Sequence, residues 1–260
     1  TGDSFCAAPM LTISEEVQKR LQEKSHKVVD SVQVIGGCNV QWAHDPKTDR
    51  DVIIEINPRT SRSSALASKA TGFPIALVSA MLAAGLTLAD IPCGKYGTLD
   101  KYKPDGDFVV VKFARWAFEK FKAVQDKLGT QMKATGEVMG IGSNLSECML
   151  KSIRSLEVGV NHIYHHKFDN MTDDQMLEYI SEFRDDNLFA IAELIYRGAT
   201  IEEIHEITKI TPYFLESFKK MVEMEKTIKA NPKDKETLIS AKKMGFGDKF
   251  IAKLWNMPEI

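Results

Sequence analysis

The side chains with the clearest capacity for chemistry lie in two short runs of the sequence. Glu55 and Asn57 share one face of an expected strand, because side chains in a strand alternate between its faces. Asn39 and Gln41 have the same spacing in the preceding run. A carboxylate flanked by amide side chains offers oxygen ligands of the kind that hold Mg²⁺ beside phosphate groups. These four residues therefore indicate a metal site.

The two runs are expected to pair as a β-hairpin. Residues 38–44 and 51–57 have the composition of strands, and the polar residues 46–50 between them are typical of a turn. Counting back from such a turn pairs Asp45 with Asp51, Gln41 with Glu55, and Asn39 with Asn57. Alternation further predicts one face with Val52, Ile54 and Ile56, and another with Ile53, Glu55 and Asn57. A structure with Gln41 and Glu55 on opposite faces would contradict the metal site.

Two arginines follow the hairpin. Arg59 and Arg62 lie where a helix is expected to begin, and arginine forks and helix N-termini both bind phosphate or carboxylate oxygens. A metal, phosphate and a small anion at one place would imply phosphoryl transfer. From composition alone, a solvated hairpin face on which Glu55 pairs with the arginines explains the same residues, and this alternative stays open.

The elements around this run mix strands and helices. A short strand is expected at 4–8, and a helix from a capping box of Thr12 and Glu15 to about Val34, where two glycines follow. The Ala-rich stretch 61–86 predicts one or two buried helices. Two further strands are expected at 107–113 and 136–141.

From about Asn144 the pattern becomes helical. Helix starts are expected at Asn144 with Glu147, Thr172 with Gln175, Thr200 with Glu203, and Thr211 before Pro212. The fold class predicted is therefore α+β, with an all-helical part at the end. We place the boundary between residues 1–157 and 158–260.

Composition excludes several function classes. The formal net charge is −2, with 34 basic and 36 acidic residues, so neither a nucleic-acid nor a membrane partner is expected. The most apolar stretch, 73–86, is shorter than the roughly 18 residues of a membrane span, and no signal peptide is found. Four scattered cysteines without a CxxC spacing predict reduced thiols in a cytoplasmic protein.

A second possible metal site is the cluster His162, His165 and His166, with Asp169 nearby. Three imidazoles within five residues can bind Zn²⁺. Nothing else in the sequence calls for a metal there, and ordinary structural histidines are the preferred interpretation.

Beyond the chemistry of single residues, the sequence resembles the carbamoyl-phosphate synthetase large chain. The run Glu55-Ile-Asn-Pro-Arg-Thr-Ser-Arg-Ser-Ser to Ala76 is similar to the signature at the end of that family's ATP-grasp domain. Further similar segments are Thr1–Ser4, Gly36–Gln41, Lys112–Phe121, Gly129–Gly142 and Leu156–Gly159. The resemblance implies the C-terminal portion of the N-terminal ATP-grasp domain, followed by an all-helical oligomerisation domain.

The resemblance also implies a function. The family makes carbamoyl phosphate from bicarbonate, ammonia and two ATP, and this half phosphorylates bicarbonate to carboxyphosphate. Gln41, Glu55 and Asn57 match ligands of Mg²⁺ or Mn²⁺, and Gln41 and Glu55 also match ATP contacts. Arg59 and Arg62 match candidate catalytic arginines, and the match of Arg62 is the weaker one. Asn39 is likewise a weaker match to a metal ligand.

The implied partners are a small glutamine amidotransferase subunit, the rest of the large chain and further copies of the protein, as a homo-oligomer. We expect an internal piece of that chain, inactive alone because no glycine-rich phosphate-covering loop is found in it. The alternatives are a helical scaffold for subunit association and another ATP-grasp ligase of the biotin-carboxylase type. The sequence does not distinguish arginine from pyrimidine synthesis.

Overall fold

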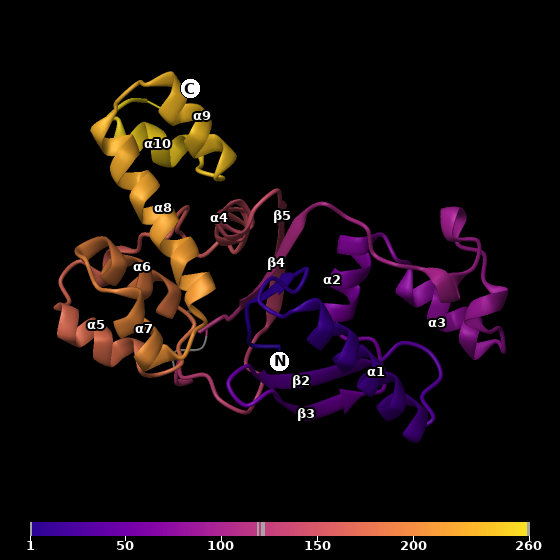
Figure 1. Ribbon diagram of the computed structural model, residues 1–260. Coiled ribbons are helices and arrows are strands. Elements are labelled where there is room, and N and C mark those ends of the chain that lie inside the picture. Colours follow the sequence, from indigo (N-terminus) through magenta and orange to yellow (C-terminus); the bar gives the residue numbers. More distant parts are fainter. Residues whose placement is uncertain (1, 119, 121–122, 259–260) are drawn as a thin grey trace. The chain divides into compact units, whose positions relative to one another are not determined.

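The computed structural model describes residues 2–118, 120 and 123–258 (Figure 1). The chain divides into two compact units. Met10–Asp107 form the hairpin unit, and Thr1–Pro9 together with Phe108–Ile260 form the sheet-and-helix unit. The fold is mixed, and a helical part follows the last strand, as the sequence predicts. Each unit is described by itself.

The hairpin unit begins with helix α1, Glu15–Ser31, and continues with strands β2, Asn39–Asp45, and β3, Arg50–Asn57. The helix N-cap is Ser14, whose hydroxyl accepts from Val17 N at 3.3 Å, so the expected start at Thr12 is wrong. The helix ends at Ser31, earlier than expected, because Gln33 takes a left-handed conformation with φ 53°.

The hairpin turn is one residue shorter than expected. Asp45 pairs with Arg50 and His44 with Asp51, so only residues 46–49 form the turn and the predicted pairing of Asp45 with Asp51 is wrong. A β-bulge between the Gln41 and Trp42 pairings then inserts Ile54 as an extra residue of β3. The bulge offsets the shorter turn and restores the register beyond it.

The bulge also changes the faces on which Ile53 and Val52 lie. Trp42 pairs with Ile53, and Val40 pairs with Ile56, so Ile53 lies on the face of Ile56 rather than on that of Glu55. Val52 pairs with Ala43, so it lies on the face of Glu55 rather than on that of Ile56. The predicted faces of Ile53 and Val52 are therefore both wrong. A strict alternation rule fails here because a bulge adds one residue without reversing the face.

Helix α1 is bound to the hairpin by polar contacts. Trp42 Nε1 donates to Ser25 Oγ at 2.8 Å. The Asp51 side chain, 1% exposed, accepts from Arg20 Nε at 2.8 Å and from Lys24 Nζ at 2.7 Å. His44 Nδ1 lies 2.9 Å from the same carboxylate. These hydrogen bonds hold the pKa of Asp51 well below its usual range, Arg20 being the largest cause and Lys24 the next.

After the hairpin come α2, Arg62–Thr71, and α3, Ile75–Ala83. Three 3₁₀ turns follow, at Leu88–Asp90, Gly94–Tyr96 and Leu99–Lys101. Val78 packs with Ile91 and Leu99 in a small core, but Leu77 is 55% exposed, so the expectation of buried helices holds only in part.

Among the described residues, no single helix is long and apolar enough to cross a membrane. The pair α2 and α3 passes that test only together, and it is bent by 111°.

The sheet-and-helix unit contains the antiparallel sheet β1-β4-β5, with strands Cys6–Ala8, Val109–Arg115 and Gly136–Gly142. All three lie close to the predicted ranges. Helix α4, Leu145–Ser155, packs on β4 and β5. Cys148 Sγ donates to the carbonyl of Val109 at 3.0 Å, and this hydrogen bond links α4 to β4.

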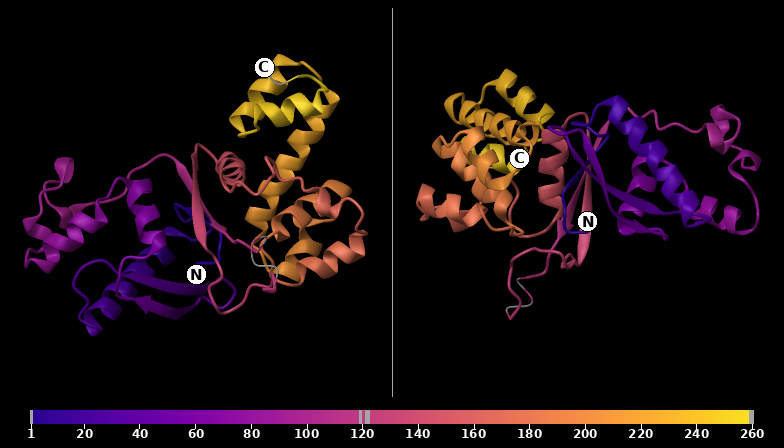
Figure 2. Two further views of the ribbon diagram at one scale, coloured as in Figure 1. Left: turned by 180° about the vertical axis from the view of Figure 1, so that it is seen from behind. Right: turned by 60° about the horizontal axis from the view of Figure 1, so that its bottom comes forward.

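The other helices of this unit follow α4 in the chain (Figure 2). They are η4, His166–Phe168; α5, Asp173–Ile180; α6, Asn187–Arg197; α7, Ile201–Thr208; α8, Pro212–Ala230; α9, Lys235–Lys243; and α10, Asp248–Leu254. Helix α8 packs against α4, α6, α7, α9 and α10. All four predicted helix starts are confirmed, although the Thr211 side chain makes no cap hydrogen bond.

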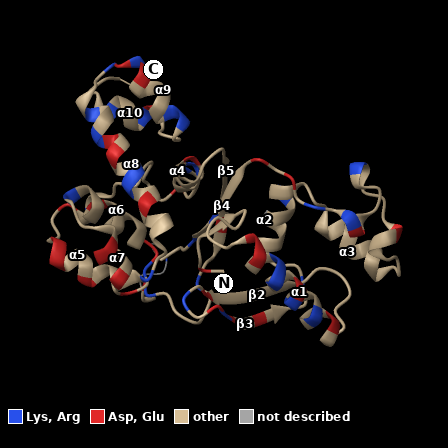
Figure 3. Ribbon diagram, viewed as in Figure 1, with Lys and Arg blue, Asp and Glu red and all other residues tan. Residues whose placement is uncertain are grey.

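Apolar side chains from these helices fill one core that includes Leu194, Ile204, Leu215 and Met221. Acidic and basic residues are interspersed along the helices of both units (Figure 3). The strands of the described chain end at Gly142, and the boundary at residue 157 stays a prediction.

Candidate metal and nucleotide site

Strand pairing brings the four predicted oxygen-bearing side chains to one end of the hairpin. Gln41 pairs with Glu55, and Asn39 pairs with Asn57, as the sequence predicts. Opposed residues in an antiparallel pair have Cβ atoms about 5 Å apart on one face. The register required for a shared site is therefore confirmed.

The side chains are joined by hydrogen bonds centred on the carboxylate of Glu55. Its Oε1 accepts from Gln41 Nε2 at 2.8 Å and from Asn57 Nδ2 at 2.9 Å. Gln41 Nε2 also donates to Asn39 Oδ1 at 3.2 Å. Glu55 is exposed, so this chain of polar groups is open to solvent.

The donor set fits a magnesium or manganese ion. Gln41 and Asn57 direct their N–H₂ groups at the carboxylate, and a rotation of each amide about its last torsion would present the carbonyl oxygen instead. One carboxylate with two amide oxygens is a partial coordination shell of the kind that phosphates and water complete. Within the described residues, no group of three or more His, Cys, Asp or Glu could hold a metal.

The arginine loop follows β3 directly. Arg59 N donates to the carbonyl of Asn57 at 2.8 Å, which forms a tight turn at Pro58. The Arg59 side chain is exposed, and its Nη1 donates to the carbonyl of Thr60 at 3.3 Å. Arg62 is the first residue of α2, and Ser61 caps that helix by accepting from Ser64 N at 3.1 Å. The structure thus places both arginines beside the strand end that carries Asn57.

A glycine positions the other strand of the site. Gly37 N donates to Ser79 Oγ at 3.1 Å, and a Cβ at this position would lie 3.0 Å from both Ser79 Oγ and Thr60 Cγ2. The close approach joins the start of β2 to α3 and to the arginine loop. Only glycine permits it without displacement of these neighbours.

Within the described residues, the three histidines form no group that could hold a metal. His162 is buried and stacks on Phe250 with ring centroids 3.7 Å apart. His165 stacks on His166 instead. The preferred interpretation of these histidines as structural residues agrees with this arrangement.

Two family comparisons place the chain in a family of ATP-dependent ligases. Residues 1–91 match the carbamoyl-phosphate synthase L chain ATP binding domain. Residues 137–260 match the carbamoyl-phosphate synthetase large chain oligomerisation domain. The chain belongs to the carbamoyl-phosphate synthetase large-chain family.

Sequence reasoning missed a second group of polar residues in the sheet-and-helix unit. Asp185 and Asn187 lie just before and at the start of α6, and both line a cavity with Trp116. The only signal in the sequence is a pair of acidic residues, Asp185 and Asp186, before an apolar helix. Such a pair is also common at ordinary helix N-termini.

Proposed function

We propose that the hairpin unit supplies metal and ATP contacts for phosphorylation of bicarbonate to carboxyphosphate, a step toward carbamoyl phosphate. The observation that carries the proposal is the hydrogen-bonded set of Gln41, Glu55 and Asn57. The match to an ATP binding domain supports the use of ATP. In such a step an oxygen of bicarbonate forms a bond to the γ-phosphorus while the bond to ADP breaks.

Each residue has a distinct role in this proposal. Glu55, Gln41 and Asn57 would hold a divalent ion, which when bound neutralises charge on the ATP phosphates. Arg59 would orient bicarbonate and stabilise the charge that develops on the transferred group, with Arg62 in support. Catalysis of this kind depends mainly on positioning and electrostatics.

The test uses Glu55→Gln, which removes the carboxylate but keeps the shape of the side chain. In the complete large chain, we expect bicarbonate-dependent ADP release to fall by roughly 100-fold or more, because a charged metal ligand is lost. Binding of Mn²⁺ to the chain, measured by water-proton relaxation, is expected to weaken in parallel. Glu23→Gln, an exposed residue of α1, is the matched control and should change neither.

Two results would argue against the assignment. Near-normal bicarbonate-dependent ATP hydrolysis in Glu55→Gln would remove the proposed role of the carboxylate. Equal Mn²⁺ affinity in Glu55→Gln and wild type would show that the ion binds elsewhere.

A second proposed role is assembly, because residues 137–260 match an oligomerisation domain. In this region Phe183 is 67% exposed and Tyr213 is 45% exposed, while Phe189 and Phe246 belong to the core. We propose that the protein self-associates through the exposed aromatic residues. We further propose that it binds the rest of the large chain and a glutamine amidotransferase subunit. Sedimentation of wild type and Phe183→Ser at several concentrations tests this, and a strictly monomeric wild type at tens of micromolar would refute it.

A further inference from the structure

The sheet-and-helix unit encloses a cavity of about 410 Å³ between its sheet and its helices. Most of its walls are apolar, with side chains that include Phe113, Met149, Ile191 and Phe218. Cavities with apolar walls favour apolar occupants, because water gains few hydrogen bonds inside them. A polar group in such a wall therefore needs a specific partner.

Asp185 supplies a carboxylate to this wall and lacks such a partner. Among the described residues, no hydrogen bond or ion pair to another residue uses its side chain. Burial, helped by the negative charge of Asp186, raises the pKa of Asp185 to about 6. A second cavity, of about 430 Å³, shares Trp116, Asp185 and Leu188 with the first, so Asp185 lies where the two adjoin.

The charged neighbours of Asp185 are already engaged. Asp186 Oδ1 accepts from Tyr179 at 2.7 Å, and its other oxygen is paired with Lys167. Arg184 Nη1 donates to Asp126 at 2.6 Å. Arg184 is also paired with Glu182, although its buried Nε has no hydrogen-bond partner. Both of these nearby cations, Lys167 and Arg184, are thus ion-paired with carboxylates other than Asp185.

Asp3 also lines the cavity, but unlike Asp185 its carboxylate accepts hydrogen bonds from other residues. The Asp3 carboxylate accepts from the backbone N–H groups of Lys133 at 2.8 Å and Ala134 at 2.7 Å. By contrast, Oδ1 of Asn187, next to Asp185 along the lining, is buried without a hydrogen-bond partner. Asp185 and Asn187 thus each bring to the lining an oxygen that accepts no hydrogen bond from another described residue.

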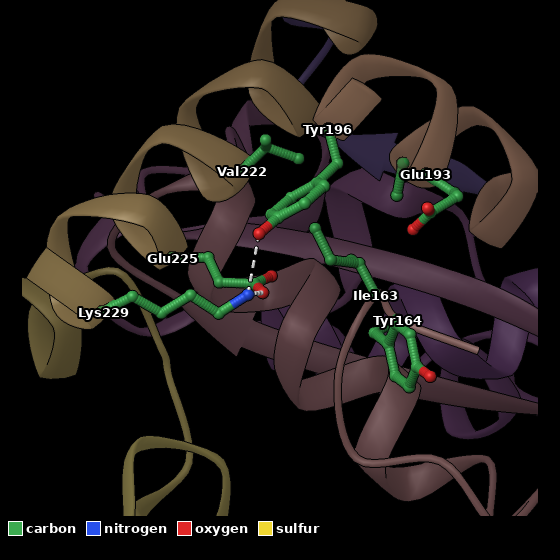
Figure 4. A pocket seen from close by; sticks show the side chains of 8 residues that line it. Ile163, Tyr164, Glu193, Tyr196, Val222, Glu225 and Lys229 are labelled. Atoms are coloured by element: carbon green, nitrogen blue, oxygen red, sulfur yellow. Dashed lines mark hydrogen bonds and ion pairs between the residues drawn. The ribbon is translucent and has the colours of Figure 1, made fainter. Parts of the chain in front are cut away.

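A small polar pocket elsewhere in the unit differs from this cavity, because its charged side chains are paired with one another. Its volume is about 150 Å³, and Lys229 there lies 2.7 Å from Glu225 and donates to Tyr196 Oη at 2.9 Å (Figure 4). Its lysine and glutamate neutralise each other. The cavity at Asp185 differs because its carboxylate has no such counterpart.

We propose that this cavity binds a small organic ammonium ion, with the ammonium group on the Asp185 carboxylate and an apolar body among Phe113, Met149 and Ile191. An ammonium donates up to three hydrogen bonds, which suits the two neighbouring acceptors of Asp185 and Asn187. A hydrogen bond between charged groups is stronger than one between neutral groups. The site is separate from the hairpin and does not depend on the proposed carboxyphosphate chemistry.

The experiment compares two probes of the same length, hexylammonium chloride and 1-hexanol, by isothermal calorimetry on the chain at pH 8. We expect hexylammonium to bind wild type at least roughly tenfold more tightly than hexanol, since a hydrogen bond to a charged group is worth that factor or more. Asp185→Asn should abolish the preference for the ammonium while it leaves hexanol binding unchanged. Asp174→Asn, an exposed residue of α5, is the matched control.

A change of pH provides a second measurement. At pH 5 the Asp185 carboxyl is largely protonated, whereas hexylammonium keeps its charge, so the preference should shrink in wild type. Asp126, Asp186 and Lys167 also affect the titration of Asp185, and His165 lines the adjoining cavity. In Asp185→Asn the pH dependence should disappear, which separates the effect from His165.

Equal binding of the two probes by wild type at pH 8 would overturn the proposal. An unchanged ammonium preference in Asp185→Asn would overturn it as well. Ile191→Phe, which reduces the volume of the cavity, should weaken both probes together. If neither probe is affected by this change, the ligand binds outside the cavity.

Discussion

Gln41 and Glu55 face each other across the β2–β3 ladder, with Gln41 Nε2 donating to Glu55 Oε1 at 2.8 Å. Their pairing depends on two features that cancel, a turn of residues 46–49 and a bulge at Ile54. Either feature alone would put Glu55 out of register with Gln41. The bulge is therefore part of what builds the site, in keeping with the frequent occurrence of bulges beside active sites.

The contacts of Asp51 predict how the hairpin unit responds to loss of one charge. Asp51→Asn removes the charge that Arg20 and Lys24 share, so we expect a fall in Tm of about 5 °C or more at pH 7 in thermal unfolding. Because the pKa of Asp51 is depressed in the folded state, its contribution is present above the unfolded-state pKa and fades as pH falls below about 4. The difference between variant and wild type should therefore shrink in acid, with Glu23→Gln as the control.

Two threonine caps allow a matched comparison. Thr200 Oγ1 accepts from Glu203 N at 3.2 Å, whereas the Thr211 side chain makes no cap hydrogen bond. Thr200→Ala should lower the free energy of unfolding by about 1 kcal/mol in urea titrations, because a helix N–H loses its partner. Thr211→Ala should change it by less than half as much. Equal losses at the two positions would contradict the cap geometry.

The packing of α4 on the sheet makes a prediction about Gly140. A Cβ at this position would lie 2.2 Å from the carbonyl oxygen of Cys148 and 2.5 Å from Ser152 Oγ. Gly140→Ala should therefore force helix and strand apart and lower the free energy of unfolding by about 1–3 kcal/mol. Gly129→Ala meets nothing within 4 Å and is expected to be close to neutral. Chemical denaturation of both variants distinguishes these outcomes.

Asp185 predicts a pH dependence of opposite sign to that of Asp51. Its folded-state pKa, about 6, lies above the ordinary value, so its favourable contribution is fully present below the unfolded-state pKa and is lost as pH rises through 6. Relative to Asp185→Asn, wild type should lose about 1–2 kcal/mol between pH 4 and pH 8, a figure reduced for partial exposure of the side chain. Unfolding titrations of both proteins across that range measure it, and a flat difference would contradict burial of an unpaired carboxylate.

Much of this protein could be derived from its sequence by local rules. The alternation of Asn39 with Gln41 and of Glu55 with Asn57 put oxygen atoms on one strand face, and the helix starts at Asn144, Thr172 and Thr200 follow from caps. The run after Glu55 carries the resemblance to the family, and it is a continuous string of residues. These features are local, so neighbouring residues along the chain suffice to predict them.

Tertiary structure decided the rest. The bulge at Ile54 is seen only in the folded hairpin, and Asp51 on the same strand is paired with Arg20 and Lys24 from a distant part of the chain. The unpaired state of Asp185 depends on Asp126, Lys167 and Tyr179, which take up its charged neighbours. Each charged side chain can pair with several partners that are far apart in the sequence. The fold therefore determines which carboxylates form ion pairs and which one does not.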